Sequence, residues 1–393
     1  KDNAREIDKP LNGLPLAIKD LTDVVGFKTT YGFPGSKNNQ PKKNSLFVNR
    51  LIDKGAIIIG KTNTAELGVG GHTINRLFGP TSNAYDLSKS AGGSSGGAAA
   101  AVQSKLIPFA DGSDMMGSLR TPSSFCETFS IRPTPGLVPS NSTLSYKMPR
   151  ISTNGVIARH PMDLALMLDG CIGKKACFEK LIRNKFSLRK VTACIPENYL
   201  ENILVDNKVT KQFYQNIETF KKLGVKIKKI NFDFEPNLFW DSWIDLRSKI
   251  ISLNLKKEFE ENSHLLKDTI IWEIERGKKI TDESIKVAKK KRSYLTKKIN
   301  EILSTFNFLI LPSAQVFPFD KNNAFPKTIN KVKTTTYHQW LEITILPSLI
   351  GLPVISIPYN TGSCKKALAT QFIGAKNEDD RLLQFALNLF NAT

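Results

Sequence analysis

Cysteine and histidine are scarce in this sequence of 393 residues, which contains 5 cysteines and 4 histidines. The number of cysteines is odd and no C-x-x-C pair occurs, which argues against a disulfide framework and against a zinc-thiolate site. The histidines lie far apart without an H-E-x-x-H pattern, so a histidine-based metal site is not indicated either. We therefore predict no metal and no other cofactor, and we expect a reducing, cytoplasmic compartment.

A long uninterrupted apolar run is also missing. The longest apolar stretch, 343–359, is broken by Pro347 and Pro353 and has the pattern of a helix end followed by a buried strand. We therefore predict that no segment spans a membrane. The first residue is Lys1 rather than Met and no apolar signal region follows it, so the sequence leaves open whether a segment precedes this chain.

Acidic residues are outnumbered, since 56 Lys and Arg face 36 Asp and Glu and give a formal charge of +20. A clustered excess of this size would indicate nucleic acid or an anionic membrane as the partner. Here the basic residues are spread along the chain, with one local run at 286–298, and no motif interleaves aromatic with basic residues. We interpret the charge as a compositional bias and predict neither nucleic acid nor a membrane as a partner.

Short apolar runs alternate with helical patterns, which predicts an α/β fold with buried strands. One buried helical face is indicated by apolar residues three or four positions apart, namely Val209, Phe213, Ile217, Phe220 and Leu223. Strands are predicted at 14–18, 56–59, 106–110, 191–195, 225–230, 308–311, 354–357 and 367–373. Long helical patterns fill 236–306, and a final helix is predicted at 380–390.

Glycine and serine are concentrated at 90–102, which reads SAGGSSGGAAAAV. Glycines of this density cannot fill a core, and the alanine run behind them favours a helix. The segment is therefore predicted to be a turn that leads into a helix N-terminus. Two interpretations remain open from these residues alone: a functional turn, or Ser94 or Ser95 acting as an ordinary N-cap.

Two further segments could carry chemistry. The first, 110–122, leaves an apolar strand and turns sharply, so Ser118 could be a nucleophile with backbone N–H groups before it as an oxyanion hole. The second, 13–20, reads GLPLAIKD and places Lys19 at a strand end, where burial would lower its pKa and create a neutral base. The alternatives are a plain polar loop and a solvated lysine.

Taken together, these segments resemble the amidase signature family of Ser-Ser-Lys serine hydrolases, over nearly the whole chain. Ser94 and Ser118 stand at the separation that the family leads us to expect. GGSSGG followed at a fixed distance by D-x-x-G-S-[IL]-R is far more specific than a lone glycine-rich loop. The matching stretches are GLPLAIKD, GKTNTAELG at 60–68, GGSSGG at 92–97, DMMGSLR at 114–120, FCETFSIRPTPGLVP at 125–139, GLPVISIP at 351–358 and ATQFIG at 369–374.

The resemblance implies the role of each matching residue. Ser118 matches the acyl-forming nucleophile, Ser94 the bridging serine held by a cis peptide bond, and Lys19 the general base. The backbone N–H groups of Met115, Met116, Gly117 and Ser118 are expected to stabilise the oxyanion. Ser95, Asp114 and Arg120 are expected to support the site, the last two as an ion pair that holds the nucleophile loop.

The resemblance also implies a mixed-sheet αβα sandwich with a helical elaboration. We expect a single domain over 1–393, with a signature-bearing part at 1–197, the helical elaboration at 236–306 and a C-terminal part at 307–393 that completes the core. Few residues precede Lys19 compared with the family's usual helical start. Because no residue of the triad is lost, we expect this difference to affect stability or dimerisation rather than catalysis. Whether the chain forms a homodimer stays open.

One departure concerns the nucleophile loop, where Met116-Gly117 replaces the two glycines usual in the family. The methionine keeps its N–H, so its side chain is expected to narrow or line the acyl pocket. The helical elaboration and the segment 312–319 are expected to complete that pocket. Phe317 and Phe319 in this segment suggest an apolar or aromatic acyl group.

The function predicted from this resemblance is hydrolysis of a small linear amide through an acyl-enzyme, with release of a carboxylate and ammonia or an amine. A second hypothesis is a glutamine-hydrolysing amidotransferase subunit that supplies ammonia to a tRNA-dependent partner. A third is an α/β-hydrolase with Ser94 as nucleophile, because 92–96 also fits G-x-S-x-G. That context is poor, since no apolar run precedes Gly92 and no histidine lies in a partner motif.

Overall fold

The computed structural model describes residues 9–140, 148–172, 178–184, 186–358 and 368–392. A mixed sheet of eight strands forms the centre of this part of the chain. In spatial order its strands are β5 (Phe109–Asp114), β7 (Thr153–Ala158), β6 (Phe129–Arg132), β13 (Val354–Ile357), β14 (Thr370–Ile373), β10 (Phe308–Pro312), β8 (Thr192–Pro196) and β9 (Lys226–Ile230). Neighbours from β5 to β10 are antiparallel, whereas β10, β8 and β9 run parallel.

Helices cover both faces of the sheet. α2 (Gly96–Gln103) and α3 (Arg120–Phe125) pack on one face of β5, β7, β6 and β13. α4 (Pro161–Ile172) and α13 (Asp379–Asn391) pack together on the other face. Strands covered on both sides are buried throughout, as in β10 and β13, because neither face meets water. The prediction of a mixed-sheet αβα fold is confirmed.

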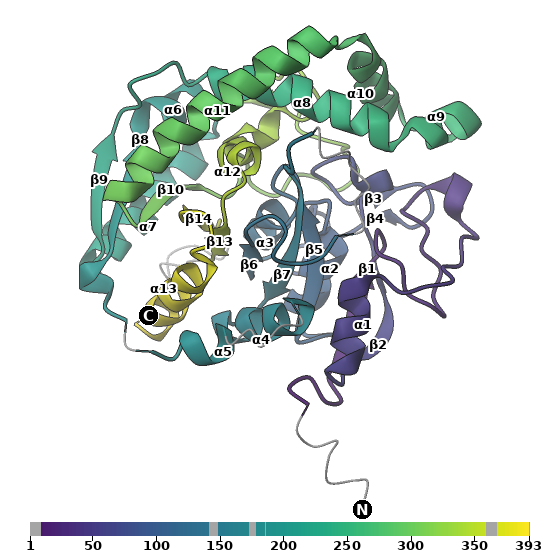
Figure 1. Ribbon diagram of the computed structural model, residues 1–393, viewed down its shortest axis with the longest axis horizontal. Coiled ribbons are helices and arrows are strands. Elements are labelled where there is room, and N and C mark those ends of the chain that lie inside the picture. Colours follow the sequence, from purple (N-terminus) through teal and green to yellow (C-terminus); the bar gives the residue numbers. More distant parts are fainter. Residues whose placement is uncertain (1–8, 141–147, 173–177, 185, 359–367, 393) are drawn as a thin grey trace, which may run out of the picture.

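A separate parallel pair lies beside β5 and carries the lysine of interest. It consists of β1 (Pro15–Lys19) and β2 (Ile57–Thr62), which are joined through α1 (Leu46–Asp53). β1 packs against β5, and Lys19 is its last residue. The end of β1 therefore lies near the turn that follows β5. This arrangement brings two segments that are distant in the sequence to one place (Figure 1).

Only helices occur in the described chain between Leu238 and Thr305, and they lie together at the top of Figure 1. They are α8 (Leu238–Asn254), α9 (Lys256–Asn262), α10 (Asp268–Lys279) and α11 (Asp282–Thr305), with one 3-10 turn between α9 and α10. The start of α11 is specified locally, because the Thr281 hydroxyl accepts the N–H of Ser284 at 3.1 Å and acidic residues occupy its first turn. α8 packs against both α10 and α11.

The helical face predicted from 209–223 is present in α7 (Asn207–Lys222), where Val209, Phe213, Ile217 and Phe220 are buried. The carboxylate of Asp206 caps this helix by accepting the N–H of Lys208 at 2.8 Å. The remaining helices are α5 (Phe178–Leu181), α6 (Glu197–Asn202), α12 (Ile345–Ile350) and the 3-10 helices η1 (Pro34–Ser36), η2 (Glu66–Gly68), η3 (Leu188–Lys190), η4 (Ser263–Leu265) and η5 (Gln339–Thr344). The remaining strands are β3 (Ile74–Asn75), β4 (Gly79–Pro80), β11 (Thr328–Ile329) and β12 (Val332–Lys333).

Most predicted strands lie within a few residues of observed ones, but the neighbourhood of β5 differs. The predicted strand ends at residue 110, whereas the observed one continues to Asp114 because its polar second half pairs with β7. β6 and β7 were not predicted from the sequence, because their polar residues obscure the apolar pattern. The start of the strand predicted at 367–373 lies outside the described residues, and β14 begins at Thr370.

Three cysteines are buried free thiols, namely Cys126, Cys171 and Cys194. The other two, Cys177 and Cys364, lie outside the described residues. Within the described part of the chain, no helix combines the length and the apolar character needed to cross a lipid bilayer.

Candidate active site

Lys19 is buried, and its side-chain nitrogen is surrounded by hydroxyl groups. Its Nζ lies 2.9 Å from the Oγ of Ser94, 2.7 Å from that of Ser95 and 3.0 Å from that of Ser113. Only 1% of the residue is exposed, so water cannot solvate a positive charge there. The solvated-lysine interpretation of the sequence is therefore wrong.

Burial lowers the pKa of Lys19 from 10.5 to about 7, while the nearby carboxylates of Asp111 and Asp114 oppose this shift. Asp111 is itself buried, which raises its pKa to about 6, and its Oδ1 accepts the backbone N–H of Lys19 at 2.8 Å. A large fraction of Lys19 is consequently a free amine near neutral pH. A neutral amine in contact with a serine hydroxyl can act as a general base.

Ser94 and Ser95 are presented by the glycine-rich turn before α2. The Gly93–Ser94 peptide bond is cis, as the resemblance implies. The turn needs glycine at Gly93, because a Cβ there would lie 2.7 Å from the backbone N of Thr73. Ser95 occupies the N-cap position of α2 but makes no capping hydrogen bond, since its hydroxyl lies against Lys19. The interpretation of these serines as simple helix caps is therefore wrong.

Ser118 lies in the turn between β5 and α3 and is 9% exposed. Its carbonyl accepts the N–H of Ser95 at 3.3 Å, which ties the two serine-bearing turns together. Ser94 and Ser118 both line one cavity of about 160 Å³. No hydrogen bond joins their hydroxyl groups in this structure, a contact that in hydrolases often forms only when substrate binds.

Gly117 allows the turn to approach its neighbours closely. Its φ is +83°, and a Cβ at this position would lie 2.7 Å from Cγ2 of Thr344. Its N–H donates to Oδ1 of Asp114 at 2.9 Å. The expectation that this N–H serves the oxyanion therefore does not fit this structure. Among the described residues, the N–H groups of Met115, Met116 and Ser118 have no acceptor in the protein.

Asp114 and Arg120 form a buried, bidentate ion pair behind this turn, with distances of 3.0 Å from Nε to Oδ2 and 2.8 Å from Nη2 to Oδ1. Burial alone would raise the pKa of Asp114, but the guanidinium groups of Arg120 and Arg132 outweigh it and hold that pKa well below its usual range. The Asp114 carboxylate also accepts the N–H of Leu119 at 3.1 Å. It therefore fixes the backbone on both sides of Ser118.

Asp111 and Ser113 are two further residues of the site that were not predicted from the sequence. Both contact Lys19, one through its backbone N–H and the other through its Nζ. Their spacing of two is the available signal, because alternate residues of a strand point to the same side. That signal applies only inside a strand, and the polar composition of this stretch is typical of a loop.

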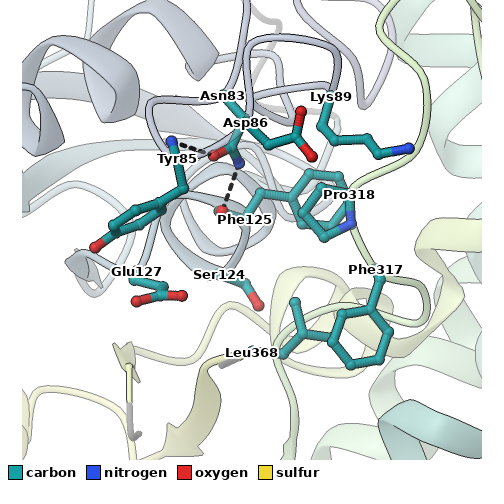
Figure 2. A pocket seen from close by; sticks show the side chains of 10 residues that line it. All are labelled: Asn83, Tyr85, Asp86, Lys89, Ser124, Phe125, Glu127, Phe317, Pro318 and Leu368. Atoms are coloured by element: carbon teal, nitrogen blue, oxygen red, sulfur yellow. Dashed lines mark hydrogen bonds between the residues drawn. The ribbon is translucent and has the colours of Figure 1, made fainter. Parts of the chain in front are cut away.

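The wall of the cavity facing these serines comes from the helical region and from η5 together with the residue just before it. Arg247, Ile251 and Leu255 belong to the first, and His338 and Leu341 to the second. The expected contribution of 312–319 is absent among the residues that line this cavity. Phe317 instead lines a different pocket, with Phe125 and Leu368, which Figure 2 shows.

Met116 lines the cavity with only 3% of its surface exposed, and its φ is not in the left-handed region. It can therefore take its place in the turn without backbone strain. Ser94, in turn, is hydrogen-bonded to Lys19 and not to a histidine, which contradicts the α/β-hydrolase hypothesis. The imidazole of His72 instead contacts the hydroxyl of Ser90 at 2.6 Å.

Comparisons with known proteins identify the family and relatives of this chain. The Amidase family model matches residues 1–383. An acylamidase of Rhodococcus erythropolis is 46% identical over 160 residues, which cover 41% of this chain but only 33% of that protein. A glutamyl-tRNA(Gln) amidotransferase subunit of Pseudothermotoga lettingae is 26% identical, with 98% of this chain and 87% of that protein covered.

Solved structures show the same fold. A bacterial aryl acylamidase described as belonging to the amidase signature enzymes superposes with a TM-score of 0.86 at 22% identity, over 97% of this chain and 83% of that chain. The corresponding glutamyl-tRNA(Gln) amidotransferase subunit of Thermotoga maritima gives a TM-score of 0.77 at 25% identity, over 95% and 82%. Because the family model matches residues 1–383, and Lys19 contacts Ser94 beside the cavity that Ser94 and Ser118 line, this chain belongs to the amidase signature family.

Proposed function

We propose that this chain hydrolyses the C–N bond of a linear carboxamide, with Ser118 as the nucleophile that carries the acyl group. The observation that supports this most directly is the buried Lys19, with a pKa of about 7, in contact with Ser94 at the cavity that Ser118 also lines. The family and the acylamidase relative support the reaction class.

A neutral amine, which offers two N–H donors and one lone pair, can meet all three hydroxyl contacts of Lys19. Ser95 donates its own proton to the carbonyl of Ser113 at 3.4 Å, so its oxygen is left to accept an N–H from Lys19. The Ser113 hydroxyl accepts the second N–H. The lone pair then faces Ser94, which lines the cavity together with Ser118.

In the proposed mechanism Lys19 takes the proton of Ser94 while Ser94 takes that of Ser118, and Ser118 attacks the amide carbonyl. The N–H groups of Met116 and Ser118 stabilise the oxyanion, and the Asp114–Arg120 pair holds the turn in place. The proton then returns through Ser94 to the leaving nitrogen as the C–N bond breaks. Water cleaves the acyl-enzyme by the same relay and releases the carboxylate.

The experiment that tests this proposal compares Ser118→Ala with Ser123→Ala. Ser123 is a matched control, because its hydroxyl is buried nearby in α3 and has no hydrogen-bond partner among the described residues. We expect Ser118→Ala to abolish both amide hydrolysis and labelling by a fluorophosphonate, while Ser123→Ala keeps both. Labelling or turnover that persists in Ser118→Ala would show that another residue is the nucleophile.

A second candidate is the glutamine-hydrolysing subunit of an amidotransferase, favoured by the relative from Pseudothermotoga lettingae that is covered over most of its length. The two candidates differ in their need for a partner. A stand-alone amidase hydrolyses amides as the isolated chain. Glutamine hydrolysis that appears only after addition of the other amidotransferase subunits would favour the second candidate.

A further inference from the structure

A buried arginine lies on the cavity wall near the nucleophile turn. Arg247 of α8 lines the cavity with Ser94 and Ser118, and its Nη1 lies 3.3 Å from the sulfur of Met115. A thioether is only a weak hydrogen-bond acceptor. This edge of the guanidinium therefore faces the substrate cavity without a strong partner among the described residues.

The other edge of the same guanidinium is fixed by a network of hydrogen bonds. Nε donates to Oε1 of Glu273 at 2.8 Å, and Nη2 donates to the hydroxyl of Tyr337 at 3.0 Å. Tyr337 in turn donates to Oε1 of Glu273, and Ser248 donates to Oε2. Both carboxylate oxygens of Glu273 thus accept hydrogen bonds, and its charge balances that of Arg247 within a buried site. The network holds the guanidinium rigidly toward the cavity.

His338 lies beside this pair and also lines the cavity, with 1% of its surface exposed. Neither of its ring nitrogens has a hydrogen-bond partner among the described residues. The carboxylate oxygen Oε1 of Glu273 is 3.9 Å from Nε2, too far for a hydrogen bond. Burial lowers the pKa of His338 to about 3, so the ring is neutral and offers one donor and one acceptor.

Unpaired polar groups at this depth are costly unless a ligand completes them. The ring of His338 packs against the rings of Trp240 and Tyr337, with centroid distances of 5.4 Å and 4.6 Å, so it is held in place. A purely hydrocarbon acyl group would leave His338 and the free edge of Arg247 unpaired. This argues against the apolar acyl group that the sequence suggested.

We propose that Arg247 and His338 form a subsite for an oxygen acceptor, a second carbonyl or a carboxylate, on the acyl group of the amide. The inference rests on the proposed function, because the acyl group stays attached to Ser118 in the same cavity. The substrate class is then the monoamides and diamides of dicarboxylic acids, rather than amides of simple fatty acids. Glu273 and Tyr337 act as positioning residues for the guanidinium.

The experiment compares three amides of equal chain length: pentanamide, glutaramide and glutaramate. Pentanamide carries no second oxygen, glutaramide adds a neutral carbonyl, and glutaramate adds a carboxylate. We expect the wild-type kcat/KM to be about 10- to 100-fold higher for at least one of the oxygen-bearing amides than for pentanamide. Which of the two is preferred identifies the form of the acceptor.

Two variants test the subsite residues. His338→Phe keeps a ring in the aromatic packing but removes both nitrogens. The double variant Arg247→Met with Glu273→Gln removes the guanidinium without leaving Glu273 as an unpaired buried charge. We expect each to reduce the preference for the oxygen-bearing amide by about tenfold or more, mainly through KM.

The matched control is the double variant Arg276→Met with Asp245→Asn. This ion pair also joins α8 and α10, at 2.7 Å, but it does not line the cavity. We expect it to keep the wild-type preference. Equal wild-type rates on all three amides, or a preference that survives both subsite variants, would overturn the inference while leaving amide hydrolysis intact. Failure of the wild type on every amide, together with no fluorophosphonate labelling, would instead overturn the proposed function.

Discussion

A carboxylate introduced beside Lys19 tests whether the burial of this lysine sets the reactivity of Ser118. In Ser113→Asp the new carboxylate replaces a hydroxyl that lies 3.0 Å from Nζ. An opposite charge at that distance raises the pKa of an amine by about 1–3 units. Because the pKa of Lys19 is lowered to about 7 by burial, we expect it to move to between about 8 and 10 in the variant.

The size of the effect follows from the fraction of free amine. At pH 7 about half of Lys19 is neutral, whereas a lysine with its usual pKa of 10.5 would be neutral in about one molecule in 3,000. We therefore expect Ser113→Asp to slow acylation at pH 7 by about 5- to 500-fold, and we expect the rate of the variant to recover as the pH rises. The proton that must be lost belongs to Lys19, so the acylation rate increases with pH in the wild type and in Ser113→Asp. Only the pH at the midpoint of this increase differs between them.

The assay is the second-order rate constant for labelling of Ser118 by a fluorophosphonate, measured between pH 5.5 and 10, which requires no knowledge of the substrate. Ser113→Asn is the control, since it has a similar size and no charge, and its midpoint should stay near that of the wild type. A midpoint that is the same in the Asp and Asn variants would refute the assignment of Lys19 as the base. A lower labelling rate of Ser113→Asp at high pH would not by itself refute this assignment, because the added negative charge also disfavours the oxyanion.

Two further predictions concern stability and the nucleophile turn. The unfolded chain binds a proton at Lys19 up to pH 10.5 while the folded chain releases it at about 7, so stability should rise with pH across this window by at most about 1.4 kcal/mol per pH unit. The free energy of unfolding, measured with urea at pH 7 and 9.5, should show this rise. Lys19→Met should remove the part of the rise that comes from Lys19. In Gly117→Ala the added methyl group would meet Thr344, so we expect a loss of about 1–3 kcal/mol and a slower labelling of Ser118. Gly60→Ala, where no atom lies within 4 Å, should change neither quantity, and equal effects of the two substitutions would contradict the steric argument.

The sequence predicted those parts of the site that lie in short contiguous motifs. Lys19, Ser94 and Ser118 stand in three such segments. In the structure the two serines line one cavity, and the amine of Lys19 lies beside it in contact with Ser94. Their grouping could not be worked out from composition, because each segment alone had an ordinary structural alternative. Asp111 and Ser113 were missed because the polar half of a strand resembles a loop when its partner strand is unknown.

The substrate wall of the cavity was not predictable from the sequence. Arg247 and His338 lie in segments without a recognisable motif, and the packing of α8 against the chain before η5 brings them together. The same limit applies to the fold. β7 pairs along the whole of β5, yet its own sequence contains Thr153 and Asn154 and shows no continuous apolar run.

The hydrogen bonds of Arg120 have a consequence for when the enzyme can become active. Besides Asp114, this guanidinium contacts the carbonyl of Thr344, the hydroxyl of Ser348 and the side chain of Gln371, each at 2.8 or 2.9 Å. These partners are more than 200 residues further along the chain. A polypeptide emerging from the ribosome therefore carries an unfinished nucleophile turn until β14 has been synthesised and docked. On the proposed function, we therefore expect chains that end before β14 to be unreactive.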